Sequence, residues 1–143
     1  MQARQRWMVV APVVIGLTLF GCTQPPEKLA KRQGPATVTA IDGSKVKQVA
    51  ITEQAAGRLG IKMAAITEEA GSKVIPYSAV VYDENGATFA FTSPAAFTYV
   101  RSSITVATIT GEKAFLTDGP ATGTEVVTVG TAELYGTEQG LGY

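Results

Sequence analysis

The sequence predicts a small all-β domain, β-rich with one or two short helices, of the barrel-like or sandwich kind. From Thr37 onward, short runs of β-branched and aromatic residues alternate with turn residues, which is typical of such domains. Asp42-Gly43 and residues 83–86 have the composition of tight hairpin turns. No sustained heptads and no repeats of 20 to 50 residues occur. We therefore expect one β-rich domain over residues 37–136.

The positions of the turn residues predict the strands in order along the chain. Two hairpins come first, and a long alternating stretch turns at Gly111-Glu112. The strands are expected at 38–41, 46–51, 78–82, 87–92, 97–110, 113–116 and 125–129. Alternate strand residues should form the core, together with two residues from the segment of the first helix. This core set is Val80, Phe89, Phe91, Val100, Ile104, Val106, Phe115, Val127, Val129, Leu59 and Ile61.

Two short helices interrupt the strand pattern. Thr52 is a good N-cap for residues 53–59, and Gly60 is a typical left-handed stop. A second turn of helix is expected at residues 132–135, between a capping Thr131 and a terminal Gly136. Residues 137–143 contain two glycines and are expected to form a frayed tail.

The composition excludes several kinds of chemistry. The chain of 143 residues has no histidine, so Ser-His-Asp, Cys-His and histidine-metal sites are excluded. Its single cysteine, Cys22, cannot form an internal disulfide or a thiolate cluster. Acidic and basic residues are equal in number, at 12 each, so no basic surface for nucleic acid is expected.

The N-terminus has the features of a secretory signal. Arg4 and Arg6 precede an uncharged apolar run over residues 8–20, which is shorter than the roughly 20 residues that span a bilayer. The run ends in Leu19, Phe20, Gly21 and Cys22, which resembles the lipobox of bacterial lipoproteins. That resemblance implies a lipoprotein signal peptide at residues 1–21, cleavage between Gly21 and Cys22, and a diacylglycerol on the Cys22 thiol. The alternative is an uncleaved anchor with a free cysteine.

A tether is expected between the lipid and the domain. Residues 22–36 contain Pro25-Pro26 and Gly34-Pro35, which oppose both helix and sheet. Their basic residues are too few for a strong headgroup site and are interpreted as part of a solvated linker. The protein is thus expected on the extracytoplasmic face of a membrane, inner or outer, anchored to membrane lipid through Cys22.

Three stretches, in order, resemble the periplasmic adaptors, or membrane fusion proteins, of efflux pumps of the resistance-nodulation-division class. The first stretch is VAITEQAAGRLGIKMAAI at residues 49–66, and the second is VIPYSAVVYDENGATFAFT at residues 74–92. The third runs from Tyr99 to Glu138. It carries a spaced series of motif residues: Arg101, Val106, Gly119, Gly123, Val126, Val127, Gly130 and Leu134.

The resemblance implies the membrane-proximal β-domain of an adaptor, which is assembled from both ends of the full-length chain. Here only residues 67–73 separate Ile66 from Val74, where the family inserts its lipoyl domain, helical hairpin and most of its β-barrel. The chain also departs from the family at Pro120, where leucine is common. A seven-residue connection costs little chain entropy, so the fused domain is expected to fold alone.

No catalytic, cofactor or metal site is expected. Asp83 and Glu84 are interpreted as outward-facing turn residues rather than an acid-base pair. Met63 supplies one soft ligand where Cu(I) requires several. The glycines at 119 and 123 lack the context of a phosphate-binding loop.

The leading hypothesis is a non-enzymatic accessory or truncated adaptor that docks on an efflux transporter. Two alternatives remain open: a structural envelope lipoprotein without a transporter partner, and a lipoprotein that binds or senses a small ligand. A concave apolar pocket lined by Phe and Tyr side chains would favour the ligand-binding alternative. Homo-oligomerisation and the choice of membrane also remain open.

Overall fold

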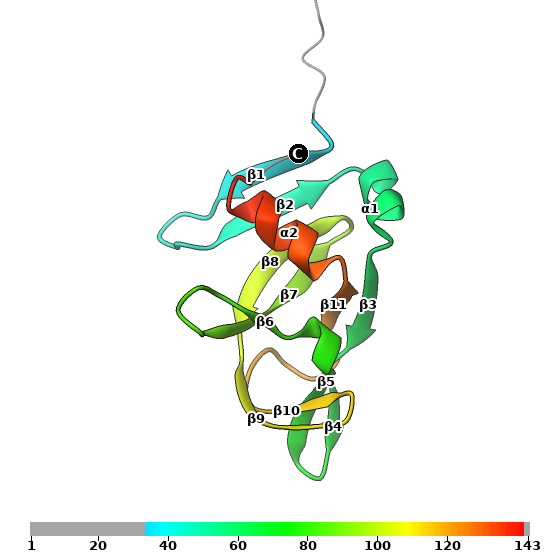
Figure 1. Cartoon of the computed structure of the whole chain (residues 1–143), viewed down its shortest axis with the longest axis vertical. Helices are drawn as coiled ribbons and strands as arrows, with labels where there is room; N and C mark the ends of the chain where they lie inside the picture. The colour runs from blue at the N-terminus through cyan, green and yellow to red at the C-terminus, as the bar shows by residue number, and fades with distance from the viewer. Residues whose placement is uncertain (1–33, 142–143) are drawn as a thin grey trace, which may run out of the picture. The chain divides into compact units, whose positions relative to one another are not determined.

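The computed structural model describes residues 34–141, and all structural statements below concern this part of the chain. It forms antiparallel sheets with two α-helices and one 3-10 helix (Figure 1). This confirms the predicted all-β class with short helices. Within the described residues, neither helix is long and apolar enough to cross a membrane.

The elements are β1 (Ala36–Ala40), β2 (Lys47–Ile51), α1 (Glu53–Leu59), β3 (Lys62–Ala65), β4 (Thr67–Glu69), β5 (Ser72–Pro76), η1 (Tyr77–Ala79), β6 (Val81–Tyr82), β7 (Thr88–Ala95), β8 (Thr98–Ser103), β9 (Thr105–Thr110), β10 (Lys113–Asp118), β11 (Glu125–Val129) and α2 (Thr131–Glu138).

The strands form two sheets. The larger, sheet A, has the order β1-β2-β8-β7-β11-β3, and β6 pairs with β7 beside this path. The smaller, sheet B, has the order β4-β5-β10-β9 and lies at the lower end of the molecule in Figure 1. The chain passes from sheet A to sheet B twice, from β3 to β4 and from β8 to β9.

Each of these passages turns at a buried isoleucine. Ile66 lies between β3 and β4, and its amide donates to the Thr124 carbonyl at 2.8 Å. Ile104 lies between β8 and β9, and its amide donates to the Thr88 carbonyl at 3.1 Å. The Thr88 hydroxyl donates a hydrogen bond to the Ile104 carbonyl at 2.7 Å. The stretch expected as one strand over residues 97–110 is therefore two strands, because Ile104 makes a corner of the kind that joins packed sheets.

Two apolar cores result. One lies under the helices and contains Phe89, Phe91 and Val127, with Leu134 from α2. The other lies between the sheets and contains both corner isoleucines, together with Ile75, Ala79, Ala90, Ala114, Leu116 and Val126. Strands β7 and β11 are central to sheet A and are buried on both faces, so consecutive residues along each strand contribute to different cores.

Most of the expected core residues are buried or pack on a core, but three do neither. Val129 is 42% exposed at the end of β11. Val100 and Phe115 are only partly buried, while their neighbours Tyr99, Ala114 and Leu116 are buried instead. Alternation separates the two faces of a strand, but it does not say which face meets the core, and β8 and β10 present the face opposite to the expected one.

The first helix matches the expectation in full, whereas the second differs at both ends. The Thr52 hydroxyl caps α1 by accepting from the Ala55 amide at 3.1 Å, and Gly60 ends it with φ 62°. Helix α2 begins after Gly130, whose φ is 91°, rather than at a capping Thr131. It continues through Gly136 to Glu138, two residues into the expected frayed tail. Helix α2 packs on β2 and β1 (Figure 1).

Candidate functional site

An open groove with a volume of about 730 Å³ lies on sheet A beside α1. Small residues of α1, Ala56 and Gly57, form one wall together with Gly60. The tip of the β7–β8 hairpin forms the other wall, and Met63 of β3 and Tyr99 of β8 lie between them. Helix α1 runs directly into β3 (Figure 1), so one short segment supplies both a wall and part of the floor.

Phe97 at the hairpin tip has an unusual backbone conformation. Its φ is 55°, in the left-handed region that costs an L-residue roughly 1–2 kcal/mol. Its carbonyl accepts from the Ile51 amide at 2.9 Å, which ties the tip to β2. The Ser93 hydroxyl donates to the Ala95 carbonyl at 2.9 Å and further fixes the turn. These bonds hold Phe97 at the groove, where it is 38% exposed.

Tyr99 and Met63 differ in exposure although both line the groove. Tyr99 is buried in the core under the helices, and this burial raises the pKa of its phenol above the ordinary value of 10.0. Met63 is 41% exposed. Among the described residues, no cluster of three or more Asp, Glu, Cys or His side chains is close enough to hold a metal ion. Met63 contributes an exposed apolar side chain to the lining.

The groove also carries charge. Glu53 of α1, Lys62 of β3 and Glu125 of β11 line it, and all three are exposed. The ion pairs found within residues 34–141 are Arg101–Glu138 and Lys113–Glu69, and neither involves a groove residue. The lining therefore combines aromatic and aliphatic side chains with two carboxylates and one ammonium group.

A polar cluster outside the groove links α2 to sheet A. The Nε of Arg101 lies 2.9 Å from Oε1 and 2.7 Å from Oε2 of Glu138, and the hydrogen bond goes to Oε1. The Lys47 amide donates to the same Oε1 at 3.1 Å, and the Lys47 ammonium donates to the Glu138 carbonyl at 3.2 Å. The Arg101 guanidinium carbon lies 4.9 Å from the Phe89 ring centroid and 5.5 Å from that of Tyr135.

Sequence reasoning missed this cluster. It noted Arg101 only as part of the adaptor-like motif and placed Glu138 in a frayed tail. The two residues are 37 positions apart, and no local spacing brings a strand arginine to a helix-end glutamate. An arginine within an otherwise apolar and small-residue strand was the one signal available, because such a residue needs a partner when the strand is buried.

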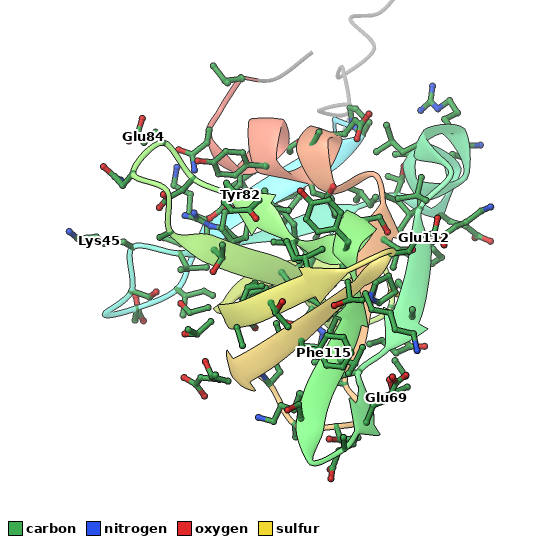
Figure 2. All side chains as sticks on the ribbon, turned by 60° about the horizontal axis from the view of Figure 1, so that its bottom comes forward. Lys45, Glu69, Tyr82, Glu84, Glu112 and Phe115 are labelled. Carbon is green, nitrogen blue, oxygen red and sulfur yellow. The ribbon has the colours of Figure 1, made fainter. Side chains whose placement is uncertain are left out.

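The remaining predicted sites lie as follows. Gly21 and Cys22 fall outside the described residues. Asp83 is a turn residue, as predicted: its carboxylate accepts from the amides of Asn85 and Ala87, each at 2.8 Å. Glu84 is exposed beside it in the same turn (Figure 2). The carbonyl of Gly119 accepts from the Lys73 ammonium at 2.5 Å, so this glycine loop packs against β5.

Comparison of the chain with known proteins finds no matching family model, no matching curated protein and no matching solved structure. The functional argument consequently rests on the residues and geometry described above.

Proposed function

We propose that the protein is a lipoprotein, anchored through Cys22 to the extracytoplasmic face of a membrane, that docks its β-domain on an efflux transporter as an accessory or truncated adaptor. In this proposal it has no catalytic role. Lipid provides proximity to the membrane, and the domain provides specificity for the partner.

The observation that carries the proposal is how the adaptor-like stretches pair. Strand β2 of the first stretch pairs with β8, and β3 pairs with β11, both from the third stretch. Strand β5, which opens the second stretch, pairs with β10 of the third. The pairing of the first stretch with the third is the arrangement that the resemblance implies for a domain assembled from both ends of a longer chain, and it supports the proposal.

The junction between the first two stretches also supports it. Residues expected as a seven-residue loop form the β4–β5 hairpin, which turns at Ala70 and Gly71 with φ of 50° and 78°. Both turn residues are exposed, and a Cβ at Gly71 would meet nothing within 4 Å. Exposed turns of this kind are the sites where chains tolerate inserted domains. A full adaptor could therefore carry its other domains here without disturbing either core.

Anchoring in the same membrane as the partner raises the occupancy of a weak docking interface. When two partners share one membrane surface, the second contact becomes effectively intramolecular, and the effective concentration reaches roughly the millimolar range. A modest interface on a domain of this size is then sufficient for occupancy.

The test is site-specific photo-crosslinking in native membranes. A photoreactive phenylalanine analogue is placed singly at the exposed positions Tyr77, Tyr82, Ile109 and Val129, which lie outside both buried cores. The proposal predicts that one group of neighbouring positions captures a polytopic transporter subunit while the others do not. Capture of no membrane protein from any position would contradict it.

A matched control separates the tether from the interface. Residues 1–22 are replaced by a cleavable signal sequence that leaves no cysteine, and the crosslinking positions are kept. The expected result is the same captured partner at a yield lowered by about tenfold or more, because the effective concentration falls. An unchanged yield would mean that lipid contributes nothing to docking.

A further inference from the structure

The groove beside α1 has features that docking on a transporter does not require. We propose that it binds a lipophilic organic cation, meaning a compact apolar molecule with a permanent positive charge. This inference is independent of the proposed docking, because it concerns the isolated protein and a small molecule.

The size and lining of the groove suit such a ligand. Its volume of about 730 Å³ falls within the roughly 300–1,000 Å³ typical of small-molecule sites. Its apolar lining includes the exposed side chains of Met63 and Phe97, and the small side chains of α1 leave room beside them. Apolar surface with an exposed aromatic ring favours a hydrophobic ligand body, with a few polar groups to orient it.

The charged residues of the groove favour a positively charged ligand. Glu53 and Glu125 line the groove, and neither forms an ion pair within residues 34–141. Only one ammonium, that of Lys62, opposes them. An aromatic face attracts a cation through its quadrupole, and the exposed ring of Phe97 offers one. The two carboxylates and the aromatic ring therefore attract a cation. The same groups repel an anion.

The backbone at Phe97 holds its ring at the groove in a fixed position. A bulky residue at positive φ persists only when its surroundings fix it, and such outliers concentrate at ligand-contacting positions. Here the Ile51 amide and the Ser93 hydroxyl fix the tip before any ligand arrives. Rigidity of this kind lowers the entropic cost of binding.

The test uses two probes of nearly the same shape and opposite charge, tetraphenylphosphonium and tetraphenylborate. Equilibrium dialysis is performed on the full chain in micelles of a neutral detergent, and protein-free micelles correct for partitioning. The proposal predicts saturable binding of the phosphonium that weakens as salt is raised. Equal binding of both probes, or no saturable binding of the phosphonium, would overturn it.

Charge-matched variants locate the site. Glu53→Gln/Glu125→Gln removes both groove carboxylates, while Glu84→Gln/Glu112→Gln removes two exposed carboxylates that do not line the groove (both labelled in Figure 2). The groove pair should weaken phosphonium binding by at least about threefold, and the control pair should have little effect. Equal weakening by both pairs would show a general charge effect and overturn the assignment.

Phe97→Gly provides a second, independent readout. Glycine adopts a φ of 55° freely, so the hairpin tip is kept while the aromatic ring is removed. Phosphonium binding should weaken by about fivefold or more, while the thermal unfolding midpoint does not fall. Unchanged binding would overturn the proposal, because the Phe97 ring is the aromatic face that it assigns to the cation.

Discussion

The carboxylate of Glu138 meets the guanidinium Nε of Arg101 inside the protein, with the two carboxylate oxygens 2.9 Å and 2.7 Å from that nitrogen. The Glu138 side chain is 1% exposed and that of Arg101 is 16% exposed. Because Glu138 is the last residue of α2 and Arg101 lies in β8, the pair fastens the C-terminal helix across sheet A. It also orders residues that the glycine content would otherwise leave frayed.

Removing one partner of this pair should be costly. Glu138→Ala leaves the Arg101 charge without its partner, and we expect a loss of about 3 kcal/mol in the free energy of unfolding, measured by urea denaturation. The free energy of detaching α2 from the sheet sets an upper limit on this loss. If the loss were larger, the helix would detach in the variant and Arg101 would be hydrated. Lys113→Ala, which breaks the exposed pair with Glu69, should cost less than about 1 kcal/mol. Equal losses would contradict the assigned role.

Gly130 should tolerate alanine far less well than Gly111. Both have positive φ, at 91° and 59°, so alanine is strained by roughly 1–2 kcal/mol at either position. A Cβ at Gly111 meets nothing within 4 Å, whereas at Gly130 it would overlap the side chain of Ile61. Thermal unfolding should show the larger loss for Gly130→Ala, and Ile61→Ala in the same chain should recover part of it. Equal losses at the two glycines would refute the steric argument.

Tyr99 should make stability fall at alkaline pH. Burial raises the pKa of its phenol in the folded state, so the folded state binds this proton more tightly than the unfolded state does. The resulting stability is fully present below the unfolded pKa of about 10 and is lost as pH rises through the higher folded pKa. Tyr99→Phe keeps the ring and removes the titration. Urea denaturation above about pH 10 should therefore show a shallower decline for the variant, and an identical decline would contradict the prediction.

The β4–β5 turn should accept an insertion. A flexible Gly-Ser segment of about ten residues between Ala70 and Gly71 lengthens an exposed turn, and we expect a loss of no more than about 2 kcal/mol. The same segment between Ser103 and Ile104 would break a buried corner and should prevent folding. Circular dichroism and urea denaturation of both variants provide the check. Failure of the first variant to fold would weaken the inferred relation to longer adaptors.

Local signals predicted much of this fold. Asp42-Gly43 marked the β1–β2 hairpin, but its turn is wider than the tight turn expected, because the last strand pair is Ala40 with Lys47 and only Gly43 of the two has a positive φ. Thr52 and Gly60 marked both ends of α1, because capping depends on the side chain and backbone of single residues. The strand at residues 125–129 was predicted to the residue.

Features that depend on distant contacts could not be predicted in this way. The alternation over residues 97–110 continues through Ile104, whereas the corner there depends on hydrogen bonds with the distant Thr88 and on burial of Ile104 in the core. Nothing local extends α2 past Gly136, and its end is set by the contact of Glu138 with Arg101. The groove likewise joins α1, β3 and the β7–β8 tip, so its lining was visible only in the fold.

Native mass spectrometry of the protein released from its own membranes tests the central claim most directly. The account predicts a chain that begins at Cys22, carries a mass increment of diacylglycerol or more on that residue, and is bound to a transporter subunit. A chain that begins at Met1 with an unmodified thiol would contradict the anchor. A lipidated chain without any transporter would contradict the proposed docking.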